Sequence, residues 1–90
     1  MKVKNAWYVY LVRCSDNSLY CGITTDIARR IEEHNNGAGS KYVKGRRPCH
    51  LVLHSFGMVK STALKLEYWI KSCPTNKKIE VFQKWLKLFN

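Results

Sequence analysis

The first quarter of the chain alternates short apolar runs with turn residues. Residues 6–13 (AWYVYLVR) are almost all apolar or aromatic, which predicts a β-strand that is buried on both faces. The Ser-Asp-Asn segment at 15–17 is typical of a turn, and residues 19–23 (LYCGI) predict a second strand. Together the two strands predict a β-hairpin.

The turn of this hairpin sets its register. In a three-residue loop the last residue, Asn17, takes a positive φ angle, and even-numbered positions then share one face. Tyr10 lies opposite Gly22 on that face, with Tyr20 diagonally beside it. The odd-numbered face is apolar and predicts core. The even-numbered face gathers hydroxyl groups beside the open space that Gly22 leaves, which indicates a site, although two tyrosines packed under a helix would give the same pattern.

A helix is predicted over residues 26–35, because a Thr-Thr-Asp segment starts it and Asn36-Gly37 ends it. At about 100° per residue, two isoleucines face the sheet, and Arg30 and His34 lie on the edge of that inward stripe. Arg30 is therefore expected to reach the sheet, unless only its stem lies along the surface with its head in water. The other charged side chains of this helix are expected to point into solvent: Arg29, Glu32 and Glu33.

The rest of the chain is predicted to form a loop, a strand and two helices. A glycine-rich loop covers 37–49, a strand covers about 50–56, and a helix starts near 61–62 and ends before Pro74. A last helix buries the face marked by Ile79, Phe82, Leu86 and Phe89. Its lysines are assigned to solvent or nucleic acid: Lys77, Lys78, Lys84 and Lys87. The order β-β-α-β-α-α predicts an α/β (α+β) fold, a three-stranded, mainly antiparallel sheet flanked by helices.

The net charge of the chain predicts the kind of partner that it binds. Ninety residues are expected to form one small domain, 1–90, and they carry 16 Lys and Arg against 6 Asp and Glu, a formal net charge of +10. Such an excess favours a polyanion, so nucleic acid, with DNA preferred, is the expected partner. No apolar run approaches the roughly 18 residues of a membrane span, and no secretory signal is seen, so a soluble cytoplasmic protein is expected.

The glycine-rich loop places basic side chains around an aromatic ring, a combination that suits a phosphate backbone and a stacked base. A merely solvated loop is the alternative. The candidate nucleic-acid-binding residues are Lys41, Tyr42, Lys44, Arg46 and Arg47, joined by Lys71 from the following helix.

Cysteine and histidine offer no metal site. The cysteines form no Cys-x-x-Cys pair, and we expect reduced core thiols with no disulfide partner. On an extended strand His50 and His54 would stand about 13 Å apart at roughly 3.3 Å per residue, too far to share one ion. The four cysteines are Cys14, Cys21, Cys49 and Cys73.

Glu67 is the one acidic residue on the inward stripe of the helix that follows the third strand. A carboxylate removed from water must find a partner or take up a proton. Lys71, one turn later, could neutralise it as an ordinary i,i+4 pair. The alternative is that Glu67 binds a metal ion.

These residues, taken in order, resemble the GIY-YIG endonuclease superfamily over roughly residues 6–73. The motif residues are Tyr8-Val9-Tyr10, Tyr20-Cys21-Gly22, Arg30, His34 and the Ala63, Glu67, Ile70 and Lys71 series. Within the superfamily the chain looks most like small stand-alone bacterial members, and the wider group includes a DNA-repair nuclease. Tyr8, Val9 and Cys21 depart from the glycine and isoleucines of the motif, at positions that supply strand packing.

The resemblance implies a metal-dependent endonuclease that hydrolyses phosphodiester bonds by a one-metal mechanism. It implies catalytic roles for Tyr10, Tyr20, Arg30, His34 and Glu67, a structural role for Gly22, and Mg²⁺ or Mn²⁺ held by Glu67. Arg30 would bind a phosphate oxygen, and one tyrosine would take the proton of the attacking water while the other orients it. A catalytically silent nucleic-acid-binding module and an accessory protein of the same fold are the alternatives.

Overall fold

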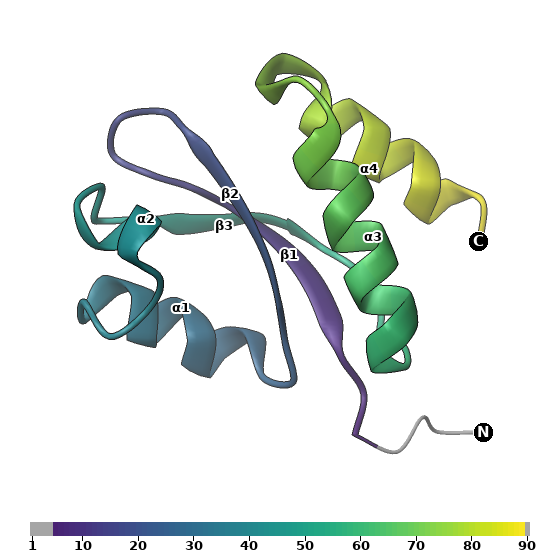
Figure 1. Cartoon of the computed structure of the whole chain (residues 1–90), viewed down its shortest axis with the longest axis horizontal. Helices are drawn as coiled ribbons and strands as arrows, with labels where there is room; N and C mark the ends of the chain where they lie inside the picture. The colour runs from purple at the N-terminus through teal and green to yellow at the C-terminus, as the bar shows by residue number, and fades with distance from the viewer. Residues whose placement is uncertain (1–4, 90) are drawn as a thin grey trace.

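Three antiparallel strands lie at the centre of the molecule in the order β2-β1-β3 (Figure 1). They are β1 (Tyr8–Arg13), β2 (Leu19–Thr24) and β3 (His50–His54) in a computed structural model that describes residues 5–89. The hairpin has the predicted register: Asn17 has a φ angle of 69°, and Tyr10 pairs with Gly22. Because β1 is central, its side chains are covered on both faces, as its apolar sequence predicted.

Helices follow the strands in the predicted order. They are α1 (Ile27–Asn35), α2 (Lys41–Lys44), α3 (Lys60–Ser72) and α4 (Lys78–Lys87), with a 3₁₀ turn, η1 (Thr75–Lys77), before the last. The start of α1 is set by Asp26, whose side chain accepts the Arg29 backbone N–H at 3.0 Å. Its end is set by Gly37, whose φ angle of 82° lies in the left-handed region that glycine adopts most readily. The predicted α+β fold, a three-stranded antiparallel sheet with flanking helices, is confirmed.

Each face of the sheet carries its own layer of helices (Figure 1). The odd-numbered face packs against α3 and α4 in an apolar cluster that consists of Val9, Leu11, Leu19, Cys21, Met58, Ala63, Leu66, Ile70 and Phe82. The even-numbered face lies under α1 and α2 in a smaller cluster, Tyr10, Val12, Cys14, Val43 and Cys49, with Tyr20 and Ile31 packed against it. Both faces are therefore core, and the second mixes hydroxyl and thiol groups with hydrocarbon.

Residues 37–49 are not the open loop that the sequence predicted. They contain α2, in which the Ser40 hydroxyl accepts the Val43 backbone N–H at 3.3 Å and Val43 is completely buried. Asn35 ties the same segment to the end of α1, because its side-chain amide exchanges two hydrogen bonds with the backbone of Cys49, at 2.8 and 2.9 Å. The basic side chains of this segment are thus attached to backbone with a defined structure, which includes α2.

Two expectations for the last helix are wrong. Lys78 is buried, and its ammonium donates to the carbonyls of Ile70, Lys71 and Cys73 at 2.8, 3.0 and 2.8 Å. It closes the end of α3, where four carbonyls lack helical partners, instead of facing solvent or nucleic acid. Phe89, expected in the core, lies beyond the end of α4 and is 59% exposed, in edge contact with Phe56.

The four cysteines are free thiols, as predicted: three are buried, and Cys73 is half-buried. None of the helices within residues 5–89 combines the length and the apolar character that a membrane crossing requires.

Candidate active site

Tyr10, His34 and Tyr20 pack together on the even-numbered face of the sheet. Tyr10 is 1% exposed, and its hydroxyl oxygen lies 2.8 Å from Nε2 of His34. The Tyr20 ring centroid is 6.4 Å from that of Tyr10 and 5.5 Å from that of His34. The two phenols thus share one face, which follows directly from the register that the turn imposes.

Gly22 shapes this group in a way that the sequence did not predict. Its missing side chain does not leave open space, because the Tyr10 ring occupies that space. A Cβ atom on Gly22 would lie 2.5 Å from the Tyr10 hydroxyl oxygen and 2.7 Å from Cζ. The Tyr10 phenol therefore packs directly against the backbone of Gly22.

Arg30 comes to the same phenol from α1, as its helical position predicted. Its side chain is 30% exposed, compared with 59% for the neighbouring Arg29. Glu33 was expected to point into solvent, but it forms an ion pair with Arg30 at 3.2 Å and a longer one with Arg29 at 4.0 Å. The guanidinium of Arg30 is thus held between a phenol and a carboxylate, with part of its surface open to solvent.

The surroundings shift the pKa values of Tyr10, His34 and Arg30 in different directions. Burial raises the pKa of Tyr10 to about 12, and Arg30 partly opposes the rise. Burial lowers the pKa of His34, and the Arg30 charge adds to that effect, so the imidazole is neutral at neutral pH. The neighbouring Tyr10 phenol, more than any other cause, raises the pKa of Arg30. The site therefore presents one positive charge, the Arg30 guanidinium, beside two neutral groups, the Tyr10 phenol and the His34 imidazole.

Glu67 stands apart from these residues, on α3 against the opposite face of the sheet. Its side chain is 18% exposed and forms the i,i+4 ion pair with Lys71 at 3.4 Å. It lies close enough to Cys21 to add to the rise that burial produces in the pKa of that thiol. The Lys71 ammonium in turn lies 5.6 Å from the centroid of the Tyr20 ring. Glu67 thus lies near the edge strand, β2, and its partner Lys71 lies near one of the two phenols, Tyr20.

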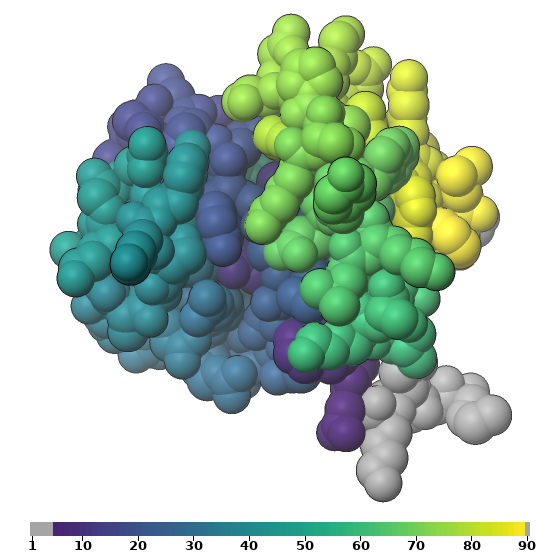
Figure 2. Space-filling model, viewed as in Figure 1, coloured from purple at the N-terminus to yellow at the C-terminus, as the bar shows by residue number. Residues whose placement is uncertain are grey.

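A cavity of about 350 Å³ opens beside Tyr20. Tyr42 stacks on the Tyr20 ring, with centroids 5.7 Å apart and planes 26° apart, so that α2 forms one wall and the end of α3 the other. Figure 2 shows a hollow on this surface between the teal region of α2 and the green of α3. The cavity is lined by Leu19, Tyr20, Cys21, Tyr42, Lys71, Thr75 and Lys78.

The basic side chains of the α2 region fall into two groups. Arg46 stacks on the Tyr42 ring at 3.9 Å and pairs with Asp16 at 3.0 Å. Arg47 donates to the backbone carbonyl of Lys44 at 2.9 Å. Both arginines thus brace their own segment, whereas Lys41 and Lys44 are exposed on α2 and form no ion pair within residues 5–89.

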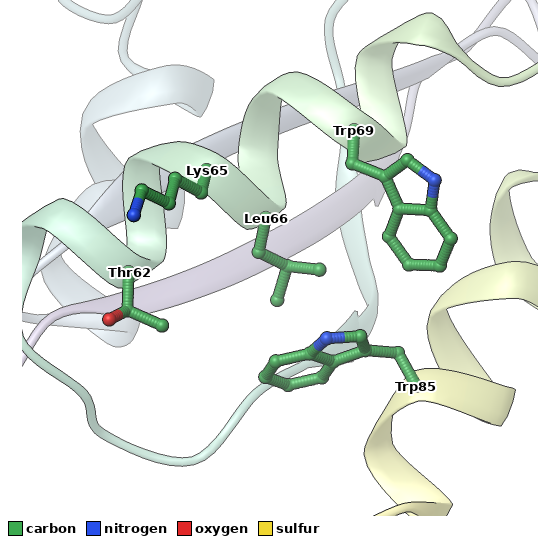
Figure 3. Close-up of a pocket in the computed structure, with 5 residues that line it drawn as sticks. All are labelled: Thr62, Lys65, Leu66, Trp69 and Trp85. Atoms are coloured by element: carbon green, nitrogen blue, oxygen red, sulfur yellow. The ribbon is translucent and has the colours of Figure 1, made fainter.

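A second hollow lies between α3 and α4, where Trp69 and Trp85 face each other across about 300 Å³ (Figure 3). Leu66 forms its floor, and Thr62 and Lys65 complete its lining. None of the candidate catalytic residues lines it.

The candidate metal ligand is the single carboxylate of Glu67. Within residues 5–89 no three His, Cys, Asp or Glu side chains gather closely enough to enclose an ion. Glu67 alone supplies a hard oxygen ligand that is partly open to solvent, which suits Mg²⁺ or Mn²⁺ that keeps most of its water. The fit requires the carboxylate to exchange Lys71 for the ion.

Comparison with known proteins identifies the family of the chain. Residues 6–87 match the model of the GIY-YIG catalytic domain, and the chain therefore belongs to the GIY-YIG family. GIY-YIG is a nuclease family, whose members act on nucleic acid and generally use divalent metal ions.

Small UPF0213 proteins are among its relatives. One from Staphylococcus aureus (strain Mu3) is 49% identical over 76 residues, 84% of this chain and 93% of that protein. The solution NMR structure of a UPF0213 protein from Bacillus halodurans is 40% identical, with a TM-score of 0.53 over 86% of this chain and 82% of that one. A solution NMR structure from E. faecalis is 31% identical, with a TM-score of 0.63 over 94% and 91%.

Sequence reasoning missed one residue that touches the candidate site. Gly39 packs directly against the His34 ring, so that a Cβ atom there would lie only 2.9 Å from Cε1 of the imidazole. The Gly-Ala-Gly-Ser segment at 37–40 was the available signal, but its glycines indicated only a loop.

Proposed function

We propose that this protein is a metal-dependent endonuclease that hydrolyses phosphodiester bonds in DNA. The observation that carries the proposal is the packing of Tyr10, Tyr20, Arg30 and His34 on one face of the sheet in a chain of the GIY-YIG family. Its place of action, on the same inference, is the cytoplasm.

Arg30 is assigned to the phosphate. Phosphodiester hydrolysis builds negative charge on the nonbridging oxygens, and a guanidinium donates to them in a fork that lysine cannot reproduce. Its ion pair with Glu33 orients the guanidinium beside Tyr10 before substrate arrives. A bound phosphate would compete with that carboxylate for the exposed part of the guanidinium.

The two phenols are assigned jointly to the attacking water, one accepting its proton and the other orienting it. Burial raises the pKa of Tyr10 to about 12 although Arg30 opposes the rise, so this phenol needs a further positive charge or N–H donor before it can act as a base at neutral pH. Nε2 of His34 is the nitrogen that lies within hydrogen-bond distance of its oxygen. Tyr20 is half-buried and lines the open cavity, where substrate would have access to it.

Glu67 is assigned to Mg²⁺ or Mn²⁺. Such an ion, when bound, stabilises the charge of the departing 3′ oxygen. The residue itself supplies one carboxylate at the β2 edge, and Lys71, released from the ion pair, becomes a second positive charge beside Tyr20.

The cavity beside Tyr20 is assigned to the nucleic acid. Tyr42, whose ring already stacks on Tyr20 and on the Arg46 guanidinium, offers its exposed edge to the nucleic acid, and Lys71 offers a cation for the backbone. Lys41 and Lys44 extend the positive surface along α2, with Arg46 and Arg47 holding that helix and its loop in place. These contacts supply affinity with little dependence on sequence.

Cleavage of labelled single-stranded, duplex and branched DNA with Mg²⁺ or Mn²⁺ tests the proposal. Glu67→Gln and Arg30→Ala are each expected to lower the rate by about 100-fold or more, the usual cost of losing one group that stabilises a transition state. Each has a matched control. Glu80→Gln removes a carboxylate with the same i,i+4 lysine pairing on α4, and Arg29→Ala removes the neighbouring, exposed arginine.

Both controls are expected to keep the wild-type rate. Equal rates for Glu67→Gln and wild type would contradict the metal assignment. A wild-type chain that binds these DNAs but cleaves none of them with either metal would instead identify a silent nucleic-acid-binding module.

A further inference from the structure

His34 has the only buried side-chain nitrogen or oxygen without a hydrogen-bond partner in the described part of the chain, its Nδ1 atom. The other ring nitrogen, Nε2, lies 2.8 Å from the Tyr10 oxygen, and the whole ring is shielded from solvent. A neutral imidazole has one N–H donor and one bare nitrogen. The nitrogen that carries the proton therefore decides whether His34 donates to Tyr10 or accepts from it.

Gly39 occupies the space in front of Nδ1. A Cβ atom on Gly39 would overlap Nδ1 outright and would lie 2.9 Å from Cε1 and 3.0 Å from Cα of His34. The hydrogen on the Gly39 Cα that stands in that direction consequently points at Nδ1. A bare nitrogen accepts such a hydrogen in a weak C–H contact. An N–H at Nδ1 would instead press two hydrogens together and would be a buried donor without an acceptor.

We infer that Gly39 holds His34 in the tautomer protonated on Nε2, so that His34 donates its N–H to the Tyr10 oxygen and does not accept the Tyr10 proton. Gly39 is a positioning residue in this arrangement, since it acts on the phenol through the imidazole. The lowered pKa of His34 agrees with this arrangement, because the ring must be neutral for Nδ1 to be bare.

The Tyr10–His34 pair is enclosed between two glycines. Gly22 packs against the Tyr10 ring on one side, and Gly39 packs against the His34 ring on the other. A side chain at either position would push the two rings out of the alignment that gives the 2.8 Å contact. The close approach of backbone at both ends holds the two rings in place, and Arg30 stands beside the phenol.

The direction of this hydrogen bond has a chemical consequence, which rests on the proposed function. An N–H that points at the Tyr10 oxygen stabilises the phenolate, as the Arg30 charge does. The hydroxyl proton of Tyr10 must then point away from His34, and a phosphate oxygen of the bound substrate would be a suitable acceptor for it. His34 thus prepares the phenol as a proton carrier without taking the proton itself.

NMR of the intact chain, labelled with ¹⁵N in histidine and held at about pH 7.5, where a histidine of ordinary pKa is mostly neutral, tests the tautomer without any cleavage assay. The wild-type spectrum is expected to show His34 protonated on Nε2, with slow solvent exchange because the ring is buried, and bare on Nδ1. A proton on Nδ1 would overturn the inference. This measurement needs no variant, so it decides the tautomer even if DNA cleavage fails, and cleavage can be found even if the tautomer is wrong.

Gly39→Ala tests the role of the glycine. We expect the slowly exchanging Nε2 proton to be lost, because the added methyl group displaces the imidazole from Tyr10. Gly45→Ala is the matched control, since a Cβ atom at Gly45 meets nothing within 4 Å. It should leave the His34 signals unchanged. A Gly39→Ala spectrum with the wild-type His34 signals would show that Gly39 does not position the ring.

Discussion

The two faces of the sheet differ in what they bury. The face under α3 and α4 is mostly apolar, and the charged groups near it include the Lys78 ammonium that closes α3 and the Glu67 carboxylate near Cys21. The face under α1 and α2 buries a phenol and an imidazole beside apolar side chains, and an arginine reaches them from α1. One strand supplies both faces, because successive residues of β1 point in opposite directions.

Because of this difference, one face of the sheet mainly stabilises the fold and the other holds the candidate catalytic side chains. Apolar burial is worth about 1.5–3 kcal/mol for each fully buried large side chain, so the face under α3 and α4 carries most of the folding free energy. The polar face gives up part of that gain, since each polar group buried there needs a partner. In return it provides a low-dielectric setting in which a phenol, an imidazole and a guanidinium influence one another. Variants on the two faces should therefore fail in different ways.

The largest effect is expected from Phe82→Ala on the apolar face. Phe82 is 0% exposed, and truncating a buried phenylalanine costs about 3–5 kcal/mol of the free energy of unfolding. Urea unfolding measures the loss, and Phe89→Ala is the control because that ring is exposed. Should Phe82→Ala prove too unstable, Phe82→Leu gives a smaller loss of the same sign. Either variant, assayed where it is folded, should cleave at the wild-type rate; a slower folded protein would contradict the separation of the two faces.

The second effect, on the polar face, depends on pH. Burial holds the pKa of His34 below its ordinary value of 6.5, so the unfolded chain binds more protons at lower pH. His34 thus contributes stability that is complete above pH 6.5 and is lost as the pH falls through the folded pKa. Urea unfolding at about pH 7.5 and about pH 5.5 should show this loss, since carboxylates of ordinary pKa titrate lower.

The control for the pH effect is another histidine. His34→Gln should remove most of the pH dependence, whereas His50→Gln should preserve it because His50, the first residue of β3, is exposed. A pH dependence that survives in His34→Gln would place its origin outside the polar face.

Prediction from the sequence was strongest where local chemistry sets the backbone. Asn17 favours the left-handed turn conformation, and the alternation of strand residues then fixed which tyrosines share a face. Asp26 and Gly37 marked the two ends of α1, and the helical period then placed Arg30 toward the sheet. Each of these steps needs only neighbours in the chain.

Prediction failed where contacts between separate elements of the fold decide the structure. The four residues of α2 are too few for a periodic signal, and the burial of Val43 under the sheet stabilises them. The burial of Lys78 could not be predicted from its sequence neighbours, because the carbonyls that it caps belong to the end of the preceding helix. The contact of Gly39 with His34 depends in the same way on the fold that brings the loop back over α1.

The smallest effect concerns the surface above the polar face. Each lysine that contacts a phosphate adds about one to the slope of log affinity against log salt concentration. Lys41→Ala/Lys44→Ala should therefore lower that slope by up to about two for duplex DNA, measured by fluorescence anisotropy across a salt series. Lys77→Ala/Lys84→Ala removes the same charge from the region of α4, where both lysines pair with Glu80, and is expected to leave the slope nearly unchanged. If both double variants lower the slope equally, DNA responds to the net charge of +10 and not to a particular face of the molecule. If only Lys41→Ala/Lys44→Ala lowers the slope, DNA binds along α2, on the side of the sheet that holds the buried phenols. DNA in that position would run past Tyr42 and into the cavity beside Tyr20.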